Sequence, residues 1–204
     1  MNFKRLLYAL PFFFILTVSP ADSFASHESP TVFVKDAVNN YLSILRSEKS
    51  KNLQSEKSLN LMKTSFDFSS ITEDLLLGLK VNDKDKSAFT NIFPLLLHKR
   101  YGIFIKSPDS LSVEYKGHEF FVDGLEAIVH TRTKIPNHDM ALDYKLHHRV
   151  GKLGDWSWKI YDITVDGISL VSNYRVQIHK TLTRMSFPDF LIYLEKIISK
   201  KTNQ

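Results

Sequence analysis

The sequence contains no cysteine, and this absence excludes several classes of protein. No disulfide can hold the chain together, no thiol can act as a nucleophile or metal ligand, and no cysteine is available for lipid attachment. Glycine is also scarce, with seven residues in a chain of 204, and they form no Gly-rich phosphate-binding loop. A single domain of this length must therefore depend on an apolar core for its stability.

Catalytic and metal-binding motifs are missing as well. The chain has neither the G-x-S-x-G motif of a nucleophile elbow nor the H-E-x-x-H motif of a zinc hydrolase. His147 and His148 are adjacent in a predicted strand and point to opposite faces, so they cannot easily share a metal ion. His138 and Asp139 lie in a predicted loop and could ligate only weakly. We therefore expect no metal site and no enzyme.

A long apolar run occurs at the N-terminus, and no later run is apolar enough to span a bilayer. Lys4 and Arg5 precede the run at residues 6–18, and small residues at 23 and 25 suit a cleavage site after Ala25. This pattern predicts a secretory signal peptide. The alternative is a membrane anchor, but the run is short for a span of about 20 residues and Pro11 interrupts it.

The predicted organisation is thus a signal peptide at 1–25 and one exported domain at 26–204. The formal net charge is +5, and removing Lys4, Arg5 and Asp22 leaves +4, so the exported domain is mildly basic. Such a domain suits anionic lipid headgroups or acidic surfaces. Because it has no basic tract, we do not expect it to bind nucleic acid.

Helical patterns come first in the exported domain. An apolar stripe follows Pro30, a weak pattern covers 47–58, and a longer stripe runs on to Phe104. Pro94 lies inside that stripe and should kink or split its helix. Several residues suit the starts of helices, either as a proline at the first helical position or as a capping residue, alone or with an acidic residue three positions later. They are Pro30, Ser70 with Glu73, Asn82 with Asp85, Ser169, and Ser186 with Asp189.

The middle of the chain alternates with period two, which is typical of strands. Strands are expected at 111–122, 125–135, 140–150 and 156–165, with a turn at Asp123-Gly124. Helices, then an antiparallel meander, then helices indicate the α+β class. One face of the predicted sheet is apolar, and we expect the long Pro94 helix and the helix after Ser169 to cover it.

Asp162 and Arg175 are the polar residues of most interest. In a regular strand Asp162 shares a face with Trp158 and Ile160, and a carboxylate there needs a partner because an unpaired buried charge is costly. Arg175, on the first turns of the next helix, can reach back to it. We interpret the two as a structural ion pair. The alternative is an acid–base group in an apolar cavity.

Four short segments carry a resemblance to a known family. Residues 158–162 (WKIYD), 166–170 (DGISL) and 173–177 (NYRVQ) resemble the strand, corner and helix start of the MlaC family, and 66–68 (FDF) is similar to another of its segments. The resemblance extends from about residue 30 to 198. It implies a curved antiparallel sheet of four or slightly more strands covered by helices, similar to the superfamily named after nuclear transport factor 2 (NTF2-like). Pro94 departs from the family pattern.

The resemblance also implies a function. It implies a periplasmic phospholipid carrier with no cofactor, which exchanges lipid with an inner-membrane ABC transporter complex and an outer-membrane lipoprotein complex. We expect a monomer that holds acyl chains in an apolar cavity between sheet and helices. The residues expected to line that cavity are Phe93, Leu97, Tyr101, Phe104, Val129, Tyr144, Leu146, Ile163, Val165, Leu170, Val171 and Tyr174.

Two other functions remain open from the residues. A small NTF2-like enzyme could use Asp162 or Tyr144 in an apolar pocket, although no second titrating group is evident beside them. A non-catalytic periplasmic adaptor would instead fill the same space with core side chains. Neither reading can be separated from the carrier by composition alone, because Leu-rich and Phe-rich stripes serve both a filled core and a cavity.

Overall fold

A computed structural model describes residues 29–101, 108–136, 138–150 and 156–200. The predicted signal peptide at 1–25, the loop at 151–155 and Phe104 lie outside these residues. Among the helices that are described, none combines the length and the apolarity needed to cross a bilayer.

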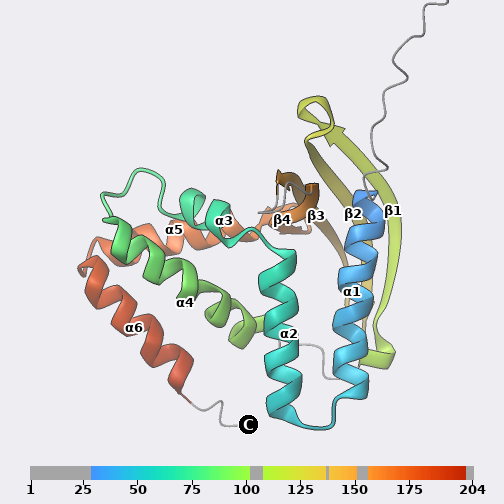
Figure 1. Cartoon of the computed structure of the whole chain (residues 1–204), viewed down its shortest axis with the longest axis horizontal. Helices are drawn as coiled ribbons and strands as arrows, with labels where there is room; N and C mark the ends of the chain where they lie inside the picture. The colour runs from blue at the N-terminus through green and yellow to red at the C-terminus, as the bar shows by residue number, and fades with distance from the viewer. Residues whose placement is uncertain (1–28, 102–107, 137, 151–155, 201–204) are drawn as a thin grey trace, which may run out of the picture.

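The chain is α+β, as predicted, and its elements alternate in blocks (Figure 1). Among the described residues, four α-helices precede the sheet and two follow it. The helices are α1 (Pro30–Ser47), α2 (Lys51–Ser65), α3 (Phe68–Leu75), α4 (Asp83–Tyr101), α5 (Leu170–Leu182) and α6 (Phe187–Ser199). The strands are β1 (Ser112–Phe121), β2 (Glu126–Ile135), β3 (His138–Val150), β4 (Trp156–Val165) and β5 (Ile168–Ser169).

The sheet is an antiparallel meander in the order β1-β2-β3-β4-β5. It has the four predicted strands plus the two-residue β5, which pairs with the end of β4. The predicted Asp123-Gly124 turn is confirmed, since both residues have positive φ angles (52° and 83°) between β1 and β2. The pairing register shifts once in β1–β2 and once in β3–β4, and such bulges bend a sheet.

The helix starts are largely as predicted. Ser169 and Ser186 accept hydrogen bonds from backbone N–H groups three residues on, and Asn82 accepts one from the N–H of Asp85. The start predicted at Ser70 is wrong. Asp67 caps α3 instead and accepts a 3.0 Å bond from the N–H of Ser70, since a carboxylate at the N-cap satisfies an amide of the first helical turn.

The predicted break at Pro94 does not split the helix, because α4 runs unbroken from Asp83 to Tyr101. Pro94 is buried, as are Phe93 and Leu97 of the same helix. A proline ring removes one backbone hydrogen bond, and the apolar contacts of the buried face hold the helix through that point. The helix therefore presents one long face to its neighbours.

Two apolar clusters hold the molecule together, and their membership corrects one prediction. One cluster joins α3, α4, α5 and α6, with Phe89 and Phe93 at its centre. The other joins the apolar sheet face to α1 through Val34, Val129 and Leu146. The apolar face of the sheet is therefore covered mainly by α1, whereas α5 contacts the sheet at β4 and α4 packs among the other helices. Figure 1 shows α1 against β1 and β2 at the right, the group of α3, α4, α5 and α6 at the left, and α2 between them.

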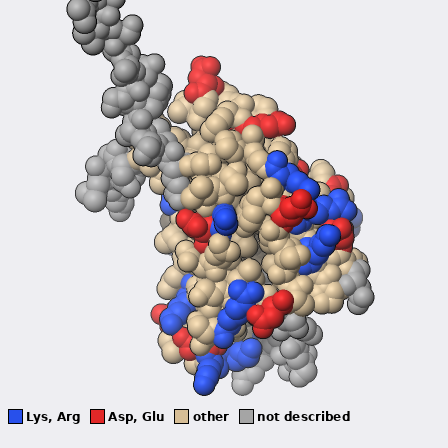
Figure 2. All heavy atoms as spheres, turned by 90° about the vertical axis from the view of Figure 1, so that its right-hand side faces the viewer, with Lys and Arg blue, Asp and Glu red and all other residues tan. Residues whose placement is uncertain are grey.

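The charged side chains of the visible surface are of both signs. Figure 2, turned so that the right-hand side of Figure 1 faces the viewer, shows Lys and Arg interspersed with Asp and Glu over the middle and lower parts of that face. That face therefore offers no continuous patch of one sign, and recognition of a ligand there would not rest on long-range attraction.

Candidate functional site

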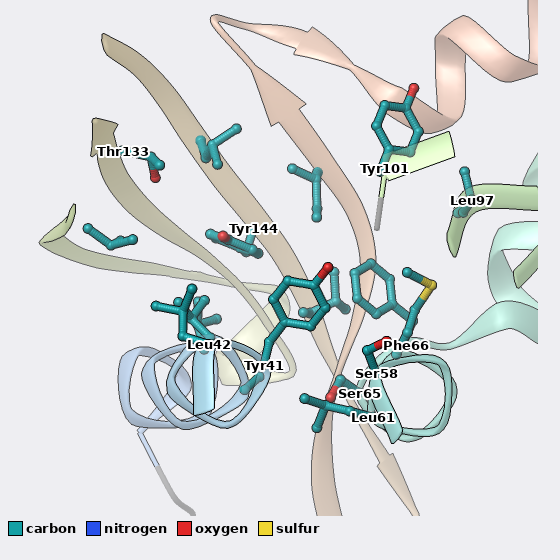
Figure 3. Close-up of a pocket in the computed structure, with 18 of the residues that line it drawn as sticks. Tyr41, Leu42, Ser58, Leu61, Ser65, Phe66, Leu97, Tyr101, Thr133 and Tyr144 are labelled. Carbon is teal, nitrogen blue, oxygen red and sulfur yellow. The ribbon is translucent and has the colours of Figure 1, made fainter. Parts of the chain in front are cut away.

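An apolar cavity of about 340 Å³ lies between the sheet, α1 and α2 (Figure 3). The end of α4 and the start of α5 complete its wall. None of the described lining residues carries a charge. They are Val34, Ala37, Val38, Tyr41, Leu42, Ser58, Leu61, Met62, Ser65, Phe66, Leu97, Tyr101, Leu111, Val113, Thr133, Leu142, Tyr144, Ile160, Ile163, Val165 and Leu170.

Two helices present their residues to the cavity at helical spacing. On α1, Val34, Val38 and Tyr41 recur every three or four residues and therefore share one face. On α2, Ser58, Leu61 and Ser65 follow the same spacing, but two of the three are polar. The sequence therefore predicted the stripe on α1 and gave only a weak pattern on α2.

A bulge in β4 determines which of its side chains enter the cavity. Leu146 of β3 pairs with Ile160, whereas the preceding Lys145 pairs with Asp162, so Tyr161 is an extra residue on β4. One extra residue shifts the alternation of side chains between the two faces. As a result Ile160 and Ile163, three residues apart, both line the cavity.

The cavity opens toward solvent near the end of strand β4. Tyr101 and Val165 line it and yet expose 38% and 36% of their surfaces, whereas Val34 and Ile160 are buried. The mouth therefore lies beside the end of α4 and the end of β4, and the closed end lies under α1. A ligand with one polar and one apolar end would have its polar end at this mouth.

The polar groups at the cavity are neutral ones. Ser58 shares a 2.7 Å hydrogen bond with Nε2 of His98, and burial lowers the pKa of His98 below its ordinary value, which favours the uncharged imidazole. Burial raises the pKa of Tyr144 well above its ordinary value. At neutral pH the cavity wall is thus uncharged, and it suits an apolar ligand rather than acid–base chemistry.

The structure sorts the predicted lining residues into three groups. Those that do line the cavity are Leu97, Tyr101, Tyr144, Ile163, Val165 and Leu170. A second cavity of only about 10 Å³ adjoins it and is lined by Phe93, Val171 and Tyr174, among others. Val129 and Leu146 are buried in the cluster between the sheet and α1, without lining either cavity.

The residues that sequence reasoning missed come mainly from α1 and α2. They include Ala37, Tyr41, Leu61 and Met62. The apolar stripe on α1 could have indicated its share, because a stripe of that kind must face the interior. No signal in the polar sequence of α2 pointed to the cavity, since its place there depends on how α2 packs between α1 and α4.

The predicted pair of Asp162 and Arg175 is wrong. Because of the bulge, the buried carboxylate of Asp162 turns to Nζ of Lys145 at 3.1 Å, to Oγ of Ser169 at 2.7 Å and to the N–H of Val171 at 3.1 Å. Arg175 faces α3 instead and donates to Asp74. Asp162 therefore fixes the start of α5 to the sheet, and Arg175 fixes α5 to α3.

A second polar cluster ties α3 to the sheet at Asp67. Its carboxylate accepts bonds from Nε2 of His147 at 2.9 Å and from Nε of Arg149 at 2.6 Å. Burial by itself would raise the pKa of Asp67, but the hydrogen bonds from His147, Ser70 and Arg149 outweigh it and hold the pKa well below its ordinary value. Asp67 is therefore a charged anchor that positions α3 and the Phe66 wall of the cavity.

No group of three or more histidine, aspartate or glutamate side chains in the described part of the chain has the geometry to hold a metal ion. The polar clusters at Asp67 and Asp162 are each accounted for by cations and amide groups of the protein itself. The apolar cavity is therefore a better candidate for ligand binding than either polar cluster.

Comparisons with known proteins give the family and the fold of the chain. The family model described as MlaC protein matches residues 35–196. Among solved structures, the phospholipid-binding protein from Ralstonia solanacearum in complex with a phospholipid superposes with a TM-score of 0.71 at 18% identity, covering 84% of this chain and 99% of that one. No curated protein sequence matches the chain.

Proposed function

The chain belongs to the MlaC family, and from this membership and its apolar cavity we propose that it is a phospholipid carrier. The acyl chains of the lipid occupy the cavity between the sheet, α1 and α2, and the headgroup stays at the mouth beside Tyr101 and Val165. The observation that carries this proposal is a cavity of about 340 Å³ whose described walls bear no charge. The phospholipid in the Ralstonia solanacearum structure supports it.

The energetics of exchange suit a carrier. Removing roughly 30 methylene groups from water at about 0.8 kcal/mol each is worth roughly 24 kcal/mol. A bilayer offers the same methylenes nearly the same gain, so the transfer between bilayer and cavity is close to balanced. No chemical step is needed, and the protein acts by binding rather than by catalysis.

The route of the lipid follows from the family resemblance. The signal peptide at 1–25 directs the chain to the periplasm, where the mature domain begins near Ser26 and works as a monomer. It exchanges lipid with an inner-membrane ABC transporter complex and an outer-membrane lipoprotein complex. Intact-mass measurement of exported protein should give a chain that starts near Ser26, and recovery of the uncleaved chain from membranes would contradict this.

The two alternative functions fit the cavity less well. An NTF2-like enzyme needs paired titrating groups in the pocket, whereas the carboxylate of Asp162 is engaged by Lys145, Ser169 and Val171 at the start of α5. A non-catalytic adaptor with a filled core would have no cavity of this size between its sheet and helices. The cavity of about 340 Å³ lies in the range of ligand pockets, about 300–1,000 Å³.

A cavity-filling variant tests the proposal. Wild-type protein should yield phospholipid on solvent extraction and mass spectrometry. Ala37→Trp places an indole in the cavity and should leave a folded protein that has lost the lipid. Val32→Trp is the matched control, because Val32 is on the same helix but 45% exposed; it should keep the lipid. Wild-type protein without lipid, or folded Ala37→Trp with its full complement, would contradict the proposal.

A further inference from the structure

One hydroxyl in the cavity wall lacks a partner within the protein. The side chain of Thr133 stands on the cavity face of β2 (Figure 3), and the residue is only 5% exposed. Its Oγ1 is buried and has no hydrogen-bond partner among the described residues. Thr131, two residues earlier on the same face, donates its hydroxyl to the carbonyl oxygen of Leu142 at 2.8 Å. An unsatisfied buried hydroxyl is destabilising, so the Thr133 hydroxyl needs an explanation.

The position of Thr133 indicates what kind of group could satisfy it. Val113 pairs with Thr133, and Leu142 pairs with both Thr131 and Val165. Thr131, Leu142 and Val165 thus form one row across the sheet. Thr133 lies two residues further along β2, toward the end of that strand and the mouth of the cavity. The two other threonine and tyrosine hydroxyls that are buried without a partner, those of Thr72 and Tyr115, belong to residues that do not line this cavity.

We infer that the Thr133 hydroxyl donates a hydrogen bond to an ester carbonyl of the bound lipid and so makes the protein selective for ester-linked chains. This inference rests on the proposed function. In a glycerophospholipid the ester carbonyls lie between the wet headgroup and the apolar chains, and Thr133, buried beside the mouth of the cavity, is placed to meet that part of the lipid. An ether-linked lipid has the same chains and headgroup but no carbonyl, and it leaves the hydroxyl unpaired.

The expected consequence is a preference for ester-linked lipids, because an ether-linked lipid leaves the Thr133 hydroxyl without a hydrogen-bond partner. A site that provides a buried hydrogen-bonding group discriminates against a ligand that lacks the matching atom, because the group of the site then stays unpaired. One hydrogen bond between neutral groups should change the affinity about three- to tenfold. The apolar part of the cavity contributes equally to both kinds of lipid.

The test compares two soluble lipids on delipidated mature protein. Dihexanoyl phosphatidylcholine and its dihexyl ether analogue are titrated calorimetrically below their micelle concentrations. Wild-type protein should bind the ester about three- to tenfold more tightly. Thr133→Val, which keeps the shape of the side chain, should bind both lipids alike, and Thr133→Ser should restore the preference. Thr131→Val is the matched control and should discriminate like the wild type.

Each outcome is decisive. Equal binding of the two lipids by wild-type protein overturns the inference without any variant, while lipid binding as such survives. A Thr133→Val protein that weakens both lipids equally, or that keeps the wild-type preference, also overturns it. If neither lipid binds wild-type protein and no lipid is extracted from it, the proposed function itself fails. A preference lost in Thr133→Val and restored in Thr133→Ser supports the inference.

Discussion

Replacing Asp162 by alanine should be among the most destabilising single changes outside the apolar clusters. The residue is 6% exposed, and its carboxylate holds Lys145, Ser169 and the N–H of Val171 within 3.1 Å. Removing one partner of a buried pair costs about 3–5 kcal/mol. The side chain of Lys145 is 30% exposed and can regain water, so we expect the lower end, about 3 kcal/mol.

Arg175→Ala should cost far less. Its partner Asp74 has a side chain that is 45% exposed, and exposed ion pairs contribute at most about 1 kcal/mol. The sequence-based pairing of Asp162 with Arg175 makes the opposite prediction, that both changes are costly and strongly coupled. The double variant therefore separates the two arrangements. With the contacts seen in the structure, the two effects should add within about 0.5 kcal/mol.

Urea unfolding followed by circular dichroism measures these free energies. With a slope of about 2 kcal/mol per molar urea, a loss of 3 kcal/mol moves the midpoint down by about 1.5 M. The double-mutant cycle of Asp162 with Lys145 should show a coupling of about 1 kcal/mol or more. A loss below about 1 kcal/mol for Asp162→Ala, or a strong coupling of Asp162 to Arg175, would refute the reasoning.

Three further outcomes follow from the site. The folded pKa of Asp67 lies below its ordinary value of 3.8, so its stabilisation is complete above about pH 4 and is lost as the pH falls further. Asp67→Asn should flatten the urea stability profile below pH 4, and an unchanged slope would count against this. The pKa of His98 is lowered from 6.5 by burial, so its stabilisation is present above pH 6.5 and lost below. Its NMR titration midpoint should lie under 6.5; a higher one contradicts the burial. Val171→Trp, against a cavity of only about 10 Å³, should overpack α5 and lower the melting temperature by several degrees. If the Val171→Trp variant melts at the same temperature as wild-type protein, the indole has found space, which would show that the two cavities are continuous.

The sequence predicted the elements better than their packing. Period-two alternation located all four main strands, and local caps located the starts after Ser169 and Ser186, because both signals depend on neighbours in the chain. The choice of α1 as the cover of the sheet could not be predicted in this way. Apolar stripes occur on α1, α4 and α5, and which of them covers the sheet depends on how the helices pack against one another. Of the sheet residues predicted to line the cavity, Tyr144, Ile163 and Val165 do so and Val129 and Leu146 do not, and the contribution of α1 and α2 was missed.

The error at Asp162 and the success at Ile163 have one physical cause. A strand read as regular places Asp162 with Trp158 and Ile160, and there a carboxylate would enter the apolar wall. The extra residue at Tyr161 reverses the alternation, so the carboxylate leaves that wall for Lys145 and the start of α5. The same reversal brings Ile163 and Val165 into the cavity. The bulge thus keeps the cavity between the sheet, α1 and α2 uncharged and places the carboxylate where it anchors α5.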